Sequence, residues 1–227
     1  MVGSKSKNAS PIKVEQTQSI SVITPEYWEE ARKHLAKKDR VMRRIIPQFG
    51  DACLQSRGDA FITLARSIVG QQISVKAAQT VWERFMLLTK KLAPASILKM
   101  NVDDMRAAGL SARKVEYLVD LALHFSNGGV HVSDWDEMSD EEIIAELIAI
   151  RGVGRWTAEM LLIFHLMRPN VLPLDDVGLI NGISLNYFSG ESVSRSEARE
   201  VAAPWAPFCS VATWYIWRSL DPQPVEY

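Results

Sequence analysis

Residues 139–167, SDEEIIAELIAIRGVGRWTAEMLLIFHLM, carry the clearest pattern in the chain. Ser139 and Glu142 have the spacing of a capping box, which marks the start of a helix. Apolar residues then recur at helical spacing up to the segment IRGVG at 150–154, and again from Arg155 onward. We therefore predict a hairpin of two helices over about 139–167, with IRGVG as the turn between them.

The predicted turn has the composition of a phosphate-binding site. Gly152 and Gly154 flank the single aliphatic residue Val153, and Arg155 follows. Glycine lets the chain reverse tightly and leaves the backbone N–H groups at a helix start accessible to an anion. An ordinary helix-to-helix turn is the alternative, because a glycine pair alone does not identify a ligand.

The rest of the chain also has helical periodicity. Helix starts are predicted at Thr24 with Pro25 in the first turn, at Asp59, at Ser74, and at Ser194, whose partner in a second capping box is Glu197. No segment alternates between polar and apolar residues like a strand. We predict an all-α fold of about ten helices, with residues 1–22 as a disordered tail and 23–227 as one folded domain.

Composition excludes several classes of protein. The 227 residues are 47% hydrophobic with a net charge of −1, and the sequence pI is near 6.4, so a broad polybasic surface is excluded and any DNA contact must come from local patches. Cys53 and Cys209 are the only cysteines, too few for an iron–sulfur cluster or a thiolate zinc site. With no apolar run of about 18 residues and no signal sequence, we expect a cytoplasmic protein without membrane contact.

Two adjacent carboxylates follow the hairpin. The segment LPLDD at 172–176 ends in Asp175 and Asp176, and helical periodicity resumes at Val177. Aspartate often caps a helix N-terminus, but one cap requires one aspartate. The second carboxylate is therefore a candidate to face a nucleotide held near the phosphate-binding turn.

Five segments together resemble the helix-hairpin-helix DNA glycosylases of base-excision repair. They are IRGVGRWTA at 150–158, LPLDD at 172–176, SIVGQQIS at 67–74, GLSARKV at 109–115 and the region 207–217. Within that superfamily the sequence is most similar to the DNA-3-methyladenine glycosylase II branch. This resemblance implies two helical lobes with the active-site cleft between them, and double-stranded DNA containing alkylated bases as the partner of a monomer.

The resemblance implies that Asp176 is the essential carboxylate. Cleavage of an N-glycosidic bond develops oxocarbenium character at the sugar carbon, which a carboxylate stabilises or helps water to attack. Asp175 is then the helix cap or a support for Asp176. At position 156, where members that also nick DNA carry a nucleophilic lysine, this chain has Trp156. We therefore expect base release without AP lyase activity.

The resemblance also implies a base pocket. Trp156 and Trp217 match aromatic positions of the alkylation-specific branch, and a cationic alkylated purine is attracted to an indole face by about 0.5–2 kcal/mol. Met160 and Val177 stand where the best-known member has tyrosines, so this pocket is expected to be less aromatic. Core packing is the alternative for any tryptophan on an apolar helix.

Two further features follow from the resemblance. Gln71, Gln72 and Ile73 match the wedge loop that fills the space left by a flipped base. Gln72 stands at the position where family members can carry an apolar wedge such as leucine. A glutamine there is alternatively a hydrogen-bonding partner for the base that has lost its pair. A simple connecting loop in which Gln71 caps a helix is the alternative. One alkali-metal ion, Na⁺ or K⁺, is expected on hairpin carbonyls, and catalysis is expected to need no cofactor. The carbonyls are those of Ile148, Ile150 and Val153.

The function expected from these observations is that of a hydrolase: a monofunctional DNA N-glycosylase that flips out alkylated purines of the 3-methyladenine and 7-methylguanine type and leaves an abasic site. Two alternatives stay open at this point. One is a non-catalytic DNA-binding or damage-sensing module that uses the same hairpin. The other is a glycosylase for oxidised or mismatched bases.

Overall fold

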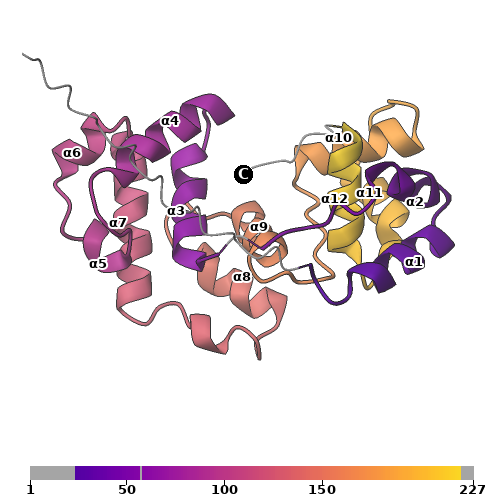
Figure 1. Cartoon of the computed structure of the whole chain (residues 1–227), viewed down its shortest axis with the longest axis horizontal. Helices are drawn as coiled ribbons and strands as arrows, with labels where there is room; N and C mark the ends of the chain where they lie inside the picture. Colours follow the sequence, from indigo (N-terminus) through magenta and orange to yellow (C-terminus); the bar gives the residue numbers. More distant parts are fainter. Residues whose placement is uncertain (1–23, 57, 221–227) are drawn as a thin grey trace, which may run out of the picture.

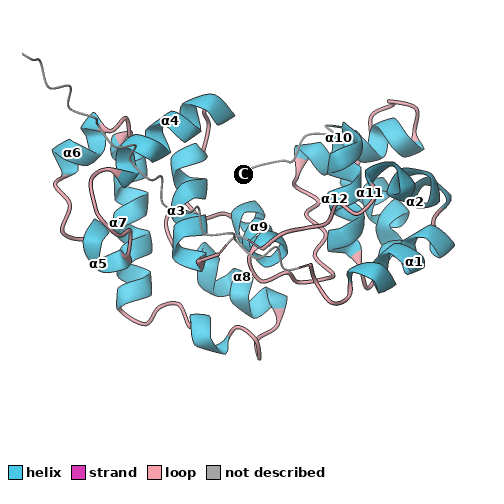
Figure 2. Cartoon of the chain, viewed as in Figure 1, coloured by secondary structure: helices cyan, strands magenta, loops and turns pink. Residues whose placement is uncertain are grey.

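The computed structural model describes residues 24–56 and 58–220, so the tail predicted at 1–22 lies outside the described part. Every regular element in the described ranges is helical, with twelve α-helices and three 3₁₀-helices (Figure 2). The all-α prediction is confirmed. The expected count of about ten is two below the twelve α-helices of the described residues, some of which are as short as α5 (Pro94–Ile97).

The helices form two groups, which lie on the left and the right of Figure 1. The group on the left is called the central lobe, because the middle of the described chain forms it. It is built from one continuous stretch: α3 (Ala60–Gly70), α4 (Val75–Met86), α5, α6 (Val102–Ala107), α7 (Ala112–Ser126), η2 (Val132–Asp134), α8 (Asp140–Ile148) and α9 (Arg155–Phe164). The terminal lobe combines the two ends of the described chain: α1 (Trp28–Lys38), α2 (Arg40–Ile45), η1 (Ile46–Phe49), α10 (Val177–Tyr187), α11 (Arg195–Ala202), η3 (Ala203–Trp205) and α12 (Cys209–Leu220).

Local capping signals fix most helix starts. Both capping boxes form reciprocally, at Ser139 and at Ser194, and the predicted caps Asp59 and Ser74 accept backbone hydrogen bonds. The start predicted at Thr24 is wrong. Helix α1 begins at Trp28, because the chain first makes a turn that ends in the bond from Trp28 N–H to the carbonyl at position 25 (2.9 Å).

A buried helix organises the terminal lobe. The first nine residues of α12, 209–217, are all buried, and this helix contacts α1, α2 and α10. Beside it, the buried carboxylate of Asp39 caps α2 through Val41 N–H (2.7 Å) and accepts from Tyr187 Oη (2.6 Å) and Trp205 Nε1 (2.8 Å). This network joins α2, α10 and η3, and it fixes α10, whose N-terminus carries the paired aspartates.

The end of α9 is tied to the terminal lobe. Tyr27 Oη donates to the carbonyl of Met167 (2.6 Å), and Ser56 Oγ donates to the carbonyl of His165 (3.3 Å). The chain leaving the hairpin is thus held against the segments that precede α1 and α3. Among the described residues no helix has the length and apolar character needed to cross a membrane.

Candidate active site

The hairpin turn requires glycine at position 152. Gly152 has φ +86°, in the left-handed region, and an added Cβ would lie 2.2 Å from Cδ2 of Tyr117. The ring of Tyr117, on α7, therefore packs where any other residue would place its side chain. Arg151 N–H is also held, by Oδ2 of Asp120 (2.7 Å). The turn between α8 and α9 is thus clamped on to α7.

The N-terminus of α9 is open to an anion. Gly154 is the N-cap residue, no side chain caps the helix, and nothing lies within 4 Å of a Cβ added at this glycine. Val153 is buried and anchors the turn. The first N–H groups of a helix carry the positive end of its dipole, so this end has the geometry of a phosphate site.

Arg155 is engaged within the hairpin. Its guanidinium forms two hydrogen bonds to Glu141 of α8, and its Nε donates to Oε1 of Glu159 (3.1 Å). Glu159 is 5% exposed, and burial raises the pKa of its carboxyl group. Sequence reasoning assigned Arg155 to phosphate and missed both glutamates, although the i,i+4 spacing of Arg155 and Glu159 was a readable signal.

Asp176, and not Asp175, caps α10. Asp176 is 5% exposed and its Oδ1 accepts from Leu179 N–H (2.6 Å). Asp175 is exposed and pairs with Arg195 of α11 (2.7 Å). The prediction of Asp175 as the cap is therefore wrong: the cap and the candidate catalytic carboxylate are the same residue.

Both predicted pocket tryptophans donate to this carboxylate. Trp156 Nε1, on α9, lies 2.8 Å from Asp176 Oδ2, and Trp217 Nε1, on α12, lies 2.7 Å from Oδ1. Asp176 thus joins three helices from both lobes. Each of its three partners is an N–H group, which can only donate and therefore matches the oxygens of an ionised carboxylate.

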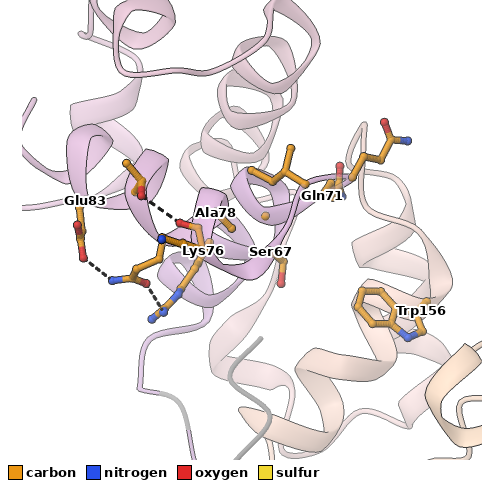
Figure 3. Close-up of a pocket in the computed structure, with 12 residues that line it drawn as sticks. Ser67, Gln71, Lys76, Ala78, Glu83 and Trp156 are labelled. Carbon is orange, nitrogen blue, oxygen red and sulfur yellow. Dashed lines mark hydrogen bonds between the residues drawn. The ribbon is translucent and has the colours of Figure 1, made fainter.

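A cavity of about 970 Å³ opens beside Trp156 (Figure 3). Its other described walls come from α3, α4 and the loop between them, so the cavity belongs to the central lobe, and Trp156 extends from it to Asp176. One wall is polar: Arg66 Nη2 donates to Gln79 Oε1 (2.9 Å), and Gln79 Nε2 donates to Glu83 Oε1 (2.8 Å).

The other three predicted pocket residues are placed differently. Trp217 is 3% exposed and stacks on Phe164 at 5.7 Å between ring centroids. Met160 is buried in the core, whereas Val177 is 70% exposed at the first turn of α10. Of the four predicted base-pocket residues, only Trp156 is among the described residues that line the cavity.

The predicted wedge loop forms the rim of the cavity. Gln71 Nε2 donates to the carbonyl of Gly152 (2.8 Å), which ties the loop to the hairpin turn. Gln72 has a left-handed φ of +58° and is exposed, and Ile73 is 40% exposed. The loop therefore presents Gln72 and Ile73 outward, while Gln71 is held against the turn.

The carbonyls predicted to bind an alkali-metal ion lie in the hairpin. The carbonyl of Ile150 accepts from Val153 N–H (3.1 Å) and retains a second lone pair. In the described ranges no group of three or more His, Cys, Asp or Glu side chains is arranged to hold a metal. An ion on the carbonyls of Ile148, Ile150 and Val153 stays a prediction.

Comparisons with known proteins match this arrangement. Residues 65–207 match the model of the HhH-GPD superfamily of base excision DNA repair proteins. DNA-3-methyladenine glycosylase 1 of Schizosaccharomyces pombe is 32% identical over 84% of this chain and 86% of its own length. A Bacillus subtilis relative is 32% identical over 70% of this chain, which spans 58% of that relative.

Solved structures agree. The structure of a Schizosaccharomyces pombe 3-methyladenine DNA glycosylase in complex with abasic DNA superposes with a TM-score of 0.76 at 30% identity, covering 86% of this chain and 100% of that one. The match to the family model includes the hairpin, the LPLDD segment and the predicted wedge loop, since all three lie within residues 65–207. This chain belongs to the HhH-GPD superfamily of base excision DNA repair proteins.

Proposed function

We propose that this protein is a monofunctional DNA glycosylase that hydrolyses the N-glycosidic bond of alkylated purines in duplex DNA, of the 3-methyladenine and 7-methylguanine type, and leaves an intact abasic site. The observation that carries the proposal is the buried carboxylate of Asp176, held by two indole N–H groups beside a cavity large enough for a nucleobase. The names of the relatives, DNA-3-methyladenine glycosylases, support the substrate class.

Binding begins at two surfaces of the central lobe. The open N-terminus of α9 holds a DNA phosphate through backbone N–H groups. The adjoining loop, with Gln72 and Ile73 outward, occupies the position that a flipped base vacates. Because Gln71 connects this loop to Gly152, the phosphate site and the wedge keep a fixed spacing.

The flipped base enters the cavity beside Trp156. A purine alkylated on a ring nitrogen is cationic, and the indole attracts it by about 0.5–2 kcal/mol. The same indole donates its N–H to Asp176 Oδ2, which connects the carboxylate to a side chain that lines the cavity. Recognition of the base and placement of the negative charge thus use one side chain.

Asp176 supplies charge in the transition state. The glycosidic bond breaks with its electron pair leaving on the base, which becomes neutral, while positive charge develops on the sugar and is stabilised by the carboxylate. A water oxygen then bonds to the sugar C1′ and its proton passes to solvent. Oδ1 already accepts two hydrogen bonds and Oδ2 accepts one, so Oδ2 keeps the lone pair available to the substrate.

The absence of strand cleavage is part of the proposal. AP lyase chemistry needs an amine nucleophile, and Trp156 occupies the position where bifunctional members carry lysine. The described cavity wall does include one amine, Lys76 of α4. Borohydride trapping on abasic DNA is expected to give no adduct. An adduct that disappears in Lys76→Ala would overturn the monofunctional assignment and identify the nucleophile.

The first experiment measures release of free bases from methylated duplex DNA by wild type and Asp176→Asn, with the strand analysed before and after hot alkali. We expect methylated purines from the wild type alone, and breaks only after alkali. Asp59→Asn is the matched control, because it makes the same change at another helix N-cap, where asparagine caps as well as aspartate. Tight duplex binding without release by the wild type would favour a binding module instead.

A further inference from the structure

Gly178 sits at the contact between the candidate catalytic carboxylate and its indole donor. It is the second residue of α10. A Cβ added here would lie 3.1 Å from Asp176 Oδ1, 3.2 Å from Trp217 Cδ1 and 3.3 Å from Trp217 Nε1. All three distances are tighter than most contacts that real Cβ atoms make. The three atoms belong to Asp176 and Trp217, which form one hydrogen-bonded pair.

Both members of that pair are restrained by other neighbours. Trp217 is buried at 3% exposure and stacks on Phe164 with an interplanar angle of 11°. The carboxylate of Asp176 is held by Leu179 N–H at 2.6 Å. A methyl group at position 178 would consequently act on the hydrogen bond itself and push the indole N–H and Oδ1 apart.

The backbone gives no other reason for glycine at this position. Gly178 does not have a positive φ, and it lies within a regular helix. Glycine inside a helix costs about 0.5–1 kcal/mol relative to alanine. Alanine would thus be favoured here if only helix formation mattered, so the space left by the missing side chain is the feature to explain.

We propose that Gly178 is a positioning residue for catalysis: its missing side chain admits the Trp217 N–H to Oδ1 of Asp176 and so leaves Oδ2 as the oxygen directed to the substrate. This inference rests on the proposed glycosylase function. In this proposal the two tryptophans have different roles. Trp156 both meets the base and binds Oδ2, whereas Trp217, which does not line the described cavity, orients the carboxylate from behind.

The first test is Gly178→Ala, measured by single-turnover base release, by affinity for duplex DNA and by thermal unfolding. We expect the rate to fall about tenfold or more, as for a weakened hydrogen bond to a charged group. Affinity should stay within about twofold and the melting temperature should change little, because the helix preference of alanine offsets part of the cost of the contact with Trp217. Asn181→Ala, exposed on the same helix, is the control and should match wild type. A wild-type rate in Gly178→Ala overturns the proposal.

A double-mutant cycle identifies the route of the effect. Trp217→Phe removes the N–H donor and part of the ring that the new methyl group would meet. If Gly178 acts through this donor, adding Gly178→Ala to Trp217→Phe should cost less than about twofold, since coupled residues are non-additive. Independent costs that multiply would contradict the proposal. If Gly178→Ala alone does not fold but the double variant does, the collision with Trp217 is supported directly.

A spectroscopic readout separates this inference from the proposed function. The indole ¹H–¹⁵N resonance of Trp217, assigned by its loss in Trp217→Phe, reports its hydrogen bond to Asp176 whether or not the protein releases bases. We expect this resonance to shift in Gly178→Ala and in Asp176→Asn but to stay in place in Asn181→Ala. A wild type inactive on methylated DNA would refute the glycosylase proposal, whereas an unchanged resonance in Gly178→Ala would refute the role of Gly178.

Discussion

Replacing Arg155 with glutamine tests how the hairpin binds DNA. The guanidinium is engaged by Glu141 and by the buried Glu159, whereas the N–H groups at the start of α9 have no side-chain cap. We therefore predict that Arg155 stabilises the hairpin and that backbone N–H groups bind the phosphate. The substitution should lower stability and leave the salt dependence of DNA binding nearly unchanged.

The magnitudes follow from burial. Removing one partner of a fully buried ion pair costs about 3–5 kcal/mol, but Arg155 is 48% exposed, so solvent screening reduces the cost to about 1–2 kcal/mol. For a chain of this size that corresponds to a loss of about 2–8 °C in melting temperature. One lost phosphate contact would change the slope of log K against log salt by about 0.9, and we predict a change below about 0.3.

The assay is fluorescence anisotropy of an undamaged duplex over a salt series, with thermal unfolding measured in parallel. Arg155→Gln combined with Glu159→Gln is the matched control, because it removes the buried charge together with its partner and should recover most of the lost stability. A slope lower by about 0.9 with an unchanged melting temperature would refute the reasoning, and Arg155 would then be a phosphate ligand.

Three further predictions concern other contacts. Tyr187→Phe removes the 2.6 Å donor to buried Asp39 and should destabilise the protein by about 1.5–3 kcal/mol in calorimetry; an unchanged midpoint would show that the contact contributes nothing. Burial raises the pKa of Glu159, so its contribution to stability declines as pH rises from its ordinary pKa, about 4.3, through the raised value. The difference in melting temperature between Glu159→Gln and wild type should therefore shift in favour of the variant as pH rises above about 4.3, and parallel curves would contradict this. Gln71→Ala breaks the bond to the Gly152 carbonyl and should weaken binding to an abasic duplex about fivefold in anisotropy; undiminished affinity would mean that the loop keeps its position without that bond.

Features that depend on neighbouring residues were predictable from the sequence. The capping boxes at Ser139 and Ser194 were found because both partners lie within one helical turn. The start of α1 was misplaced by a few residues because Thr24 and Pro25 also suit the turn that precedes Trp28. Caps are local chemistry, but the residue at which a turn becomes a helix depends on backbone angles that the sequence leaves open.

The sequence predicted which residues belong to the candidate site better than it predicted the contacts between them. Asp176 was singled out, yet Asp175 was expected to be the cap or a support for Asp176. Either aspartate could adopt the extended conformation that a cap needs, and only the fold places Oδ1 of Asp176 on Leu179 N–H. The bond from Trp217 joins residues 41 positions apart. No periodicity reports such a contact, and the assignment of this tryptophan to a pocket wall came from the family resemblance.

The order in which the two lobes occur along the chain has a consequence for biosynthesis. The central lobe is contiguous in sequence, whereas the terminal lobe needs both α1 and α12. Domains generally fold as they leave the ribosome, with N-terminal parts first. The hairpin turn at 150–154, the predicted phosphate site, therefore emerges well before Trp217, and the carboxylate of Asp176 receives its second indole donor only when α12 has been translated. A nascent chain that ends before residue 217 therefore holds the hairpin turn but lacks one of the two indole donors that hold Asp176.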